Sequence, residues 1–233
     1  MNLIKTIKTI LISSKEIIIT YILSYILIII SCLIYTLISN QDLTNFINTT
    51  CSYILIIFYI ITSIYLYKKN PQSQSKLSIT NYFPLILLGI SIATLLNMLI
   101  FLIIPPQTNA TLSIPLAIIS SGIIGPIYEE ILFRHILYNR LKKQYATKKA
   151  LLLTTATFAL IHLSPIKIIY AFILSLFLNL AYERHQNIIA PILIHMAANT
   201  IVIFLSEYNT YILLLSIVSM IISIKLNFNY KIK

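Results

Sequence analysis

The sequence predicts an all-α fold, a polytopic transmembrane helical bundle of about eight spans with both termini in the cytoplasm. The first observation is composition. The 233 residues are 58% hydrophobic and only 10% charged, with a mean hydropathy of +0.91, which is more apolar than a soluble domain. The second is a series of apolar segments of membrane-spanning length. The third is the distribution of basic residues between those segments.

Eight segments carry enough apolar residues to cross a hydrocarbon core about 30 Å thick, the shorter ones with the help of charged flanks. They cover roughly residues 17–38, 51–67, 82–104, 112–138, 150–163, 166–182, 188–205 and 210–226. The first is longer than a signal-peptide core and no small-residue cleavage site follows it, so we expect a retained span.

The chain reads as a single membrane domain in three parts. Residues 1–111 hold a surface helix and three generic spans, residues 112–205 hold four spans that carry the polar residues, and residues 206–233 hold the last span and a basic tail. The surface helix is predicted because Ile4, Ile7, Ile10 and Leu11 recur at helical spacing, with Lys5 and Lys8 on the opposite side.

The formal net charge of +11 reflects basic residues confined to alternate loops. Such asymmetry places the basic loops and both termini in the cytoplasm. Fifteen of the 17 Lys and Arg residues belong to this set: Lys5, Lys8, Lys15, Lys68, Lys69, Lys76, Arg140, Lys142, Lys143, Lys148, Lys149, Arg184, Lys225, Lys231 and Lys233. The other loops hold none, apart from Lys167 just inside the sixth span. Because no groove-reading motif accompanies these blocks, we expect the lipid bilayer and no nucleic acid as a partner.

Ionisable residues also occur inside or close to the predicted spans, where a charge costs from about 3 to over 10 kcal/mol and is rarely idle. They are Glu129, Glu130, Arg134, His135, His162 and His195. At about 1.5 Å per residue, three different helices place polar residues about 12–18 Å from the cytoplasmic loops. We therefore expect Glu129, His162, His195 and Asn199 around one water-accessible cavity, with roughly 4–6 Å between the polar atoms of Glu129 and His162 if they share a water.

The spacing of these residues predicts their roles. Glu130 and Arg134 stand at i and i+4, the favoured orientation for a helical ion pair, which leaves Glu129 without that partner. Glu129 is then the candidate general base, with His162 holding the attacking water. His195 and Asn199, also at i and i+4, can donate hydrogen bonds to a developing oxyanion. The alternative is that these groups only hold helices together.

Two further features have plain structural explanations. Gly122 and Gly125, followed by Pro126, permit close helix approach and a kink that opens room for substrate, although ordinary packing explains them equally well. Cys32 and Cys51 form no CxxC pair and are expected as small apolar side chains, with no disulfide required.

Three motifs in order resemble the CPBP family, which includes the CAAX prenyl proteases and the bacteriocin-processing (Abi) enzymes. They are Glu129-Glu130-x-x-x-Arg134, Phe158-x-x-x-His162 and His195-x-x-x-Asn199, and the resemblance covers roughly residues 112–205. It implies an intramembrane glutamic endopeptidase (type II CAAX type) near the cytoplasmic leaflet. Glu129 and His162 would activate water, His195 and Asn199 would form the oxyanion hole, and Glu130 and Arg134 would shape the site. His135 departs from the family, which commonly has glycine there.

Other functions remain open. A zinc-dependent protease would use Glu129, His162 and His195 as ligands, but His-Glu-x-x-His is absent and Arg134 disfavours a cation, so no metal or cofactor is expected. A non-catalytic bacteriocin-immunity protein could use the same fold, whereas a transporter should show paired repeats that are absent. The substrate stays open between a prenylated protein, a peptide precursor and a membrane-protein fragment. The Ile-, Lys- and Asn-rich composition indicates a bacterial cell membrane.

Overall fold

The structure is a computed structural model that describes residues 3–39, 43–104 and 112–228, and these ranges contain helices and no strand. In chain order the α-helices are α1 (Leu3–Ser13), α2 (Lys15–Ile38), α3 (Leu43–Phe46), α4 (Ser52–Lys69), α5 (Tyr82–Phe101), α6 (Ile114–Ala117), α7 (Gly125–Glu130), α8 (Asn139–Lys142), α9 (Thr147–Leu160), α10 (Pro165–His185), α11 (Ile189–Val202) and α12 (Thr210–Phe228). Three π-helical segments, η1 (Ile47–Cys51), η3 (Ile118–Ile124) and η4 (Ile131–Tyr138), continue neighbouring α-helices, and η2 (Ile79–Asn81) is a 3₁₀ turn.

Each of the eight predicted segments contains a helix, so the all-α multi-pass membrane fold is confirmed. Among the described residues, six helical stretches are long and apolar enough to cross a membrane, and the longest runs without a break from α6 to α8. The remaining two, α9 and α11, have 14 residues each, or about 21 Å of helix. The count of eight spans and the cytoplasmic placement of both termini stay predictions. Lys231 and Lys233 of the basic tail lie outside the described residues.

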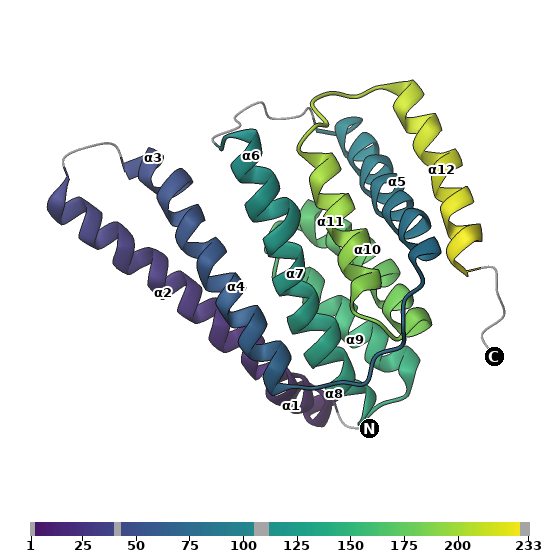
Figure 1. Cartoon of the computed structure of the whole chain (residues 1–233), viewed down its shortest axis with the longest axis horizontal. Coiled ribbons are helices and arrows are strands. Elements are labelled where there is room, and N and C mark those ends of the chain that lie inside the picture. The colour runs from purple at the N-terminus through teal and green to yellow at the C-terminus, as the bar shows by residue number, and fades with distance from the viewer. Residues whose placement is uncertain (1–2, 40–42, 105–111, 229–233) are drawn as a thin grey trace.

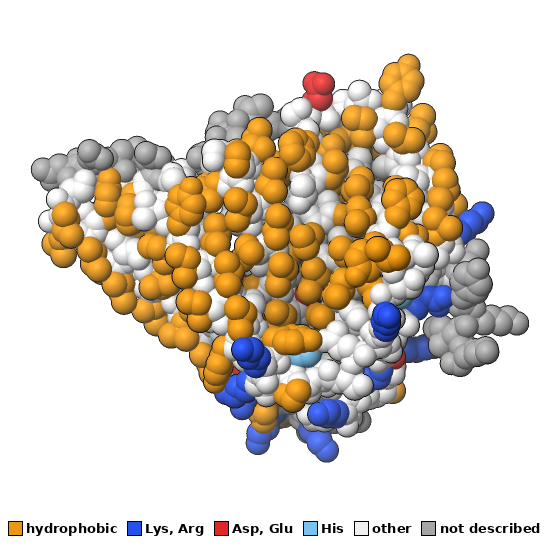
Figure 2. Space-filling model, viewed as in Figure 1, with side chains coloured by type: hydrophobic (Ala, Val, Ile, Leu, Met, Phe, Trp, Pro, Cys, Tyr) orange, Lys and Arg blue, Asp and Glu red, His pale blue; other side chains and the backbone are white. Residues whose placement is uncertain are grey.

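Charge and apolar surface separate along the bundle. Figure 2 shows a broad band of hydrophobic side chains over the helices, with the Lys and Arg side chains gathered at the lower and right-hand edges of the view. The segregation of basic side chains from the apolar band is the pattern that the loop charges predict.

The long helix α6–α8 runs through the middle of the bundle, with α2 and α4 on one side and α5 and α12 on the other (Figure 1). Every residue of its η4 segment, Ile131–Tyr138, is buried. The chain therefore centres its core on the helix that carries the Glu-Glu-x-x-x-Arg motif.

Two glycines bring α11 unusually close to its neighbours. A Cβ on Gly89 of α5 would lie 2.2 Å from the carbonyl oxygen of Ile194, and one on Gly122 of η3 would lie 2.8 Å from Oγ1 of Thr200. Only glycine permits such approaches. They set the position of α11, which carries the third motif, against the long helix; at Gly122 this confirms the close helix approach expected from the sequence.

Candidate active site

Glu129 and Glu130 end the short helix α7, which lies between the two π-helical segments η3 and η4. π-Helical turns are wider than α-helical ones and occur frequently at functional sites. Pro126 lies in the first turn of α7, directly after η3, where its missing N–H is tolerated. The apolar pattern of the sequence predicts a single long helix here, and its π-helical segments carry no signal in that pattern.

The predicted ion pair between Glu130 and Arg134 is confirmed. Arg134 Nη1 lies 2.9 Å from Glu130 Oε1, and neither side chain is exposed. The rest of the guanidinium is satisfied by α10, because Nη2 donates to Ser175 Oγ at 2.7 Å and Nε donates to Asn179 Oδ1 at 3.3 Å. Asn179 in turn donates to Thr155 Oγ1 of α9 at 2.9 Å. The ion pair thus joins three helices through one hydrogen-bonded network.

Ser175, Asn179 and Thr155 were not singled out by the sequence reasoning. Their only signal was the placement of Ser175 and Asn179 at i and i+4 in an otherwise apolar segment, which matches the face that a buried arginine would need. Polar residues of this kind are common in membrane helices and need a partner before they point to a site.

His195 lies between the two acids. Its Nδ1 is 2.7 Å from Glu130 Oε1, its Nε2 is 3.7 Å from Glu129 Oε2, and its side chain is 3% exposed. An ionised carboxylate accepts hydrogen bonds, so with Glu130 ionised as in its pair with Arg134, Nδ1 carries the proton and Nε2 is directed toward Glu129. Arg134 thus pairs with Glu130 and leaves Glu129 without that partner, as the helical spacing predicts, and Glu129 instead faces the ring of His195 from another helix.

Glu129 is the more accessible of the two acids, with 23% of its side chain exposed against 0% for Glu130. It lines a cavity of about 280 Å³ together with Tyr59 of α4, Ser121 and Asn199. A carboxylate that reaches a cavity from a buried polar network can meet water and substrate there.

His162 lies in the turn that follows α9, because that helix ends at Leu160 and not at residue 163 as predicted. Its Nδ1 is 2.9 Å from the carbonyl oxygen of Phe158. A carbonyl only accepts, so Nδ1 carries the proton and Nε2 is left to accept a hydrogen bond. This tautomer suits a histidine that holds a water molecule.

Asn199 connects two cavities. It lines the cavity of Glu129 and also an adjoining one of about 500 Å³ that contains His162, and Ser121 is likewise common to both. Its Nδ2 donates to the carbonyl oxygen of Ser121 at 3.1 Å, which leaves its second N–H for another acceptor. Glu129 and His162 thus line two cavities that share Ser121 and Asn199, in place of the single predicted cavity, and His195 is not among the lining residues of either.

Phe158 brings the three motifs together. The ring is buried, lies 4.7 Å from Arg134 Cζ, and contacts His162 and His195 at centroid distances of 5.1 and 5.8 Å. One aromatic side chain therefore packs against a member of each motif.

His135 stands at the position where the CPBP family commonly has glycine, and its side chain packs against α4 and the residue that follows it. It is buried, its Nε2 is 2.6 Å from the carbonyl oxygen of Asn70, and its ring stacks on Tyr67 at 4.7 Å. It faces α4 and the segment after it, away from Glu129.

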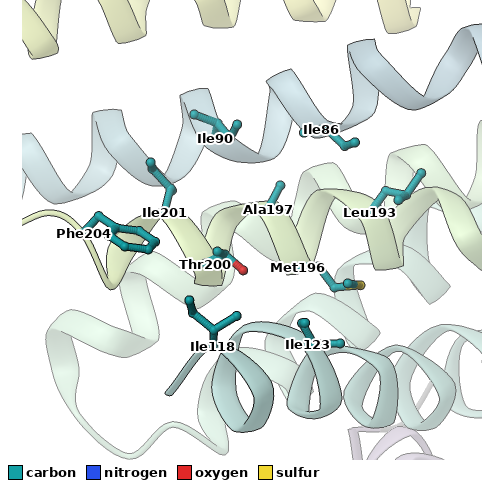
Figure 3. A pocket seen from close by; sticks show the side chains of 10 residues that line it. All are labelled: Ile86, Ile90, Ile118, Ile123, Leu193, Met196, Ala197, Thr200, Ile201 and Phe204. Atoms are coloured by element: carbon teal, nitrogen blue, oxygen red, sulfur yellow. The ribbon is translucent and has the colours of Figure 1, made fainter. Parts of the chain in front are cut away.

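A third cavity, of about 390 Å³, lies between α5, η3 and α11 (Figure 3). Its lining is apolar except for Thr200, and none of the four predicted catalytic residues lines it. It offers no group that could activate water.

The described part of the chain contains no group of three or more His, Cys, Asp or Glu side chains arranged to hold a metal ion. His195 faces Glu129, but its other ring nitrogen is bound to Glu130, which Arg134 neutralises. The donor geometry therefore does not favour the zinc alternative.

Comparison with known proteins agrees with this architecture. The model of the Rce1-like type II CAAX prenyl endopeptidases matches residues 111–201, the part of the chain that holds all three motifs. The chain is also similar to a Bacillus subtilis (strain 168) protein with the name "Putative membrane peptidase YdiL", at 31% identity over 93 residues. That match covers 40% of this chain and 38% of the relative's length. No solved structure matches the chain.

The matched region, its three ordered motifs and the multi-pass membrane fold lead to one conclusion: residues 111–201 are similar to the CAAX-protease-related membrane proteins of the CPBP family.

Proposed function

We propose that this protein is an intramembrane glutamic endopeptidase in which Glu129 activates water. The observation that carries the proposal is that the two adjacent acids differ in their exposure and in their partners. Glu130 is fully buried and bound by Arg134 and His195, whereas Glu129 reaches a cavity with its carboxylate 3.7 Å from His195 Nε2. Such a division suits one structural acid and one reactive acid.

Hydrolysis would begin with a water held between the Glu129 carboxylate and Nε2 of His162. Glu129 removes a proton as the water oxygen attacks the scissile carbonyl carbon, and the protonated Glu129 then donates to the leaving amide nitrogen. The C–N bond breaks, and the products are a carboxylate and an amine. His162 acts here as a hydrogen-bond acceptor that orients water.

The tetrahedral oxyanion would be stabilised by Asn199 and His195. Asn199 has one N–H not used by Ser121, and it lies where the two cavities meet. His195 uses Nδ1 for Glu130, so donation to the oxyanion from Nε2 requires a ring that is protonated on both nitrogens. Each such donor contributes about 2.7–4 kcal/mol to transition-state stabilisation in known oxyanion holes.

Arg134 and Glu130 would act as positioning residues, which hold His195 in place and do not touch the substrate. Arg134 neutralises Glu130, and Glu130 fixes the orientation of the His195 ring through the 2.7 Å bond to Nδ1. The carboxylate that orients a catalytic histidine in other hydrolases has the same task. The substrate class that fits is a peptide or membrane protein whose chain enters from the bilayer, a prenylated protein or peptide precursor included.

The test compares the short peptides in membranes of cells that produce the wild-type protein, Glu129→Gln or Glu183→Gln. Glu183 is a matched control, because its side chain is 28% exposed and pairs with Lys142 outside the site. We expect a set of cleavage products in wild-type and Glu183→Gln membranes that is lost with Glu129→Gln at equal protein abundance. Equal products in all three, or a biological function such as bacteriocin immunity that survives Glu129→Gln, would contradict the proposal.

A further inference from the structure

Lys167 stands apart from the other basic residues of the chain. The sequence assigns 15 of the 17 to one alternating set of loops, and Arg134 is used by Glu130. Lys167 lies in the first turn of α10 and lines the cavity of about 500 Å³ that also contains His162 and Asn199. Its ammonium group is therefore the cation of the cavity next to the proposed reaction centre.

The turn that precedes Lys167 lies at an intermediate level along the length of the bundle. Phe158 of α9 packs on Arg134, so the end of α9 at Leu160 is near the level of Glu130. On the N-terminal side of Glu130 the long helix extends back to Ile114, and this part of the helix is about 24 Å long. Figure 1 likewise shows α6 at the upper end of the bundle and α9 in its lower half. Lys167 lies in the first turn of α10, directly after this loop. It therefore lies between the two ends of the bundle and not at either of them.

The lysine is exposed and takes part in none of the ion pairs of the described residues. A charge at membrane depth is costly and marks a substrate or ion pathway when it lines a water-filled cavity. A cation without an acidic partner in a cavity suits an anion that comes and goes, because a permanent internal partner would neutralise it.

We propose that Lys167 is a specificity-determining residue that binds a carboxylate of the peptide substrate. This proposal rests on the peptidase function proposed above. A cavity of about 500 Å³ is roughly 10 Å across, and an extended peptide advances about 3.3–3.6 Å per residue. The carboxylate is therefore within about three residues of the cleaved bond, and it is either the C-terminal α-carboxylate or an Asp or Glu side chain.

The experiment uses the purified full-length protein, in phosphatidylcholine vesicles and in parallel in phosphatidylglycerol vesicles, and a library of short apolar peptides. One arm compares free with amidated C-termini, and the other places a single Asp, or the isosteric Asn, at each position in turn. The variants are Lys167→Met, which keeps the length of the side chain, and Lys167→Glu. Lys148→Met, at an exposed lysine in the first turn of α9, is the control.

We expect kcat/KM to favour the carboxylate peptide by about tenfold or more in the wild type and in Lys148→Met, the range for a hydrogen bond to a charged group. Lys167→Met should lose this preference while its rate on neutral peptides is unchanged, and Lys167→Glu should disfavour the carboxylate peptide. The arm that shows the preference identifies the source of the carboxylate.

Two results would overturn the proposal while the peptidase function stands. One is equal cleavage of acidic and neutral peptides by the wild type. The other is a Lys167→Met effect that is the same for all peptides and appears only in phosphatidylglycerol vesicles, which would assign the lysine to a lipid phosphate. If the wild type cleaves no peptide of the library, the peptidase function itself fails and the proposal fails with it.

Discussion

Arg134→Ala is expected to destabilise the protein more than any substitution of a surface ion pair. The substitution leaves Glu130, whose side chain is 0% exposed, without its cation at 2.9 Å. An uncompensated buried charge costs about 3–5 kcal/mol of stability. The loss of the packing between Arg134 Cζ and the ring of Phe158 at 4.7 Å adds to this cost.

The free energy of unfolding is measured in detergent by denaturant titration, together with protein abundance in the membrane. The matched control is Lys142→Ala, which removes the more exposed pair with Glu183. A solvent-exposed pair contributes about 1 kcal/mol or less. We therefore expect a large loss for Arg134→Ala and a small one for Lys142→Ala.

A second substitution separates the stranded charge from lost packing. Glu130→Gln removes the charge that Arg134 neutralises, so the double variant Glu130→Gln/Arg134→Ala should be more stable than Arg134→Ala alone. A double variant as unstable as the single one would refute the stranded-charge argument. Normal stability of Arg134→Ala would show that the ion pair contributes nothing.

The remaining predictions concern the site and its supports. Asn199→Ala should lower kcat by about 10²–10³ with unchanged unfolding temperature, and a wild-type kcat would remove it from the oxyanion hole. His162→Ala should abolish cleavage at normal membrane abundance, and wild-type cleavage by the purified variant would refute its role with water. Gly89→Ala should lower both unfolding temperature and activity, since its Cβ would lie 2.2 Å from the carbonyl oxygen of Ile194. Leu99→Ala, a 44% exposed position on the same helix, is its control, and equal behaviour of the two would show that α11 tolerates displacement.

Much of the fold could be predicted because the bilayer imposes length and polarity on each segment. All eight apolar segments contain helices, and the ion pair between Glu130 and Arg134 follows from helical spacing alone. Segment length and polarity alone could not determine the number of membrane spans, because six helices of the described residues are long and apolar enough to cross a membrane, against eight predicted. The helix α9 ends at Leu160 although the apolar segment continues, and Leu163 has a positive φ of 59°, a local turn that hydropathy does not record.

The partners of the site residues were harder to predict than the residues themselves. The contact of Glu129 with His195 and the bonds of Arg134 to Ser175 and Asn179 join helices far apart in the sequence. The contact of Glu129 with His195 depends on the position of α11, which the close approaches at Gly89 and Gly122 set and no local pattern specifies. The roles of Glu129, His162, His195 and Asn199 in catalysis remain predictions.

The most direct test of the central claim is single-turnover cleavage in H₂¹⁸O by the purified wild-type protein, Glu129→Gln and the control Glu183→Gln. The substrate is the peptide whose cleavage the membrane comparison identifies. If Glu129 is a general base, the new carboxylate of the product takes its oxygen from solvent and contains ¹⁸O, and Glu129→Gln lowers the rate by about 10²–10⁴. Wild-type cleavage by Glu129→Gln would contradict the account. So would a single-turnover product without ¹⁸O, because its oxygen would then come from a carboxylate of the protein that had attacked the substrate as a nucleophile.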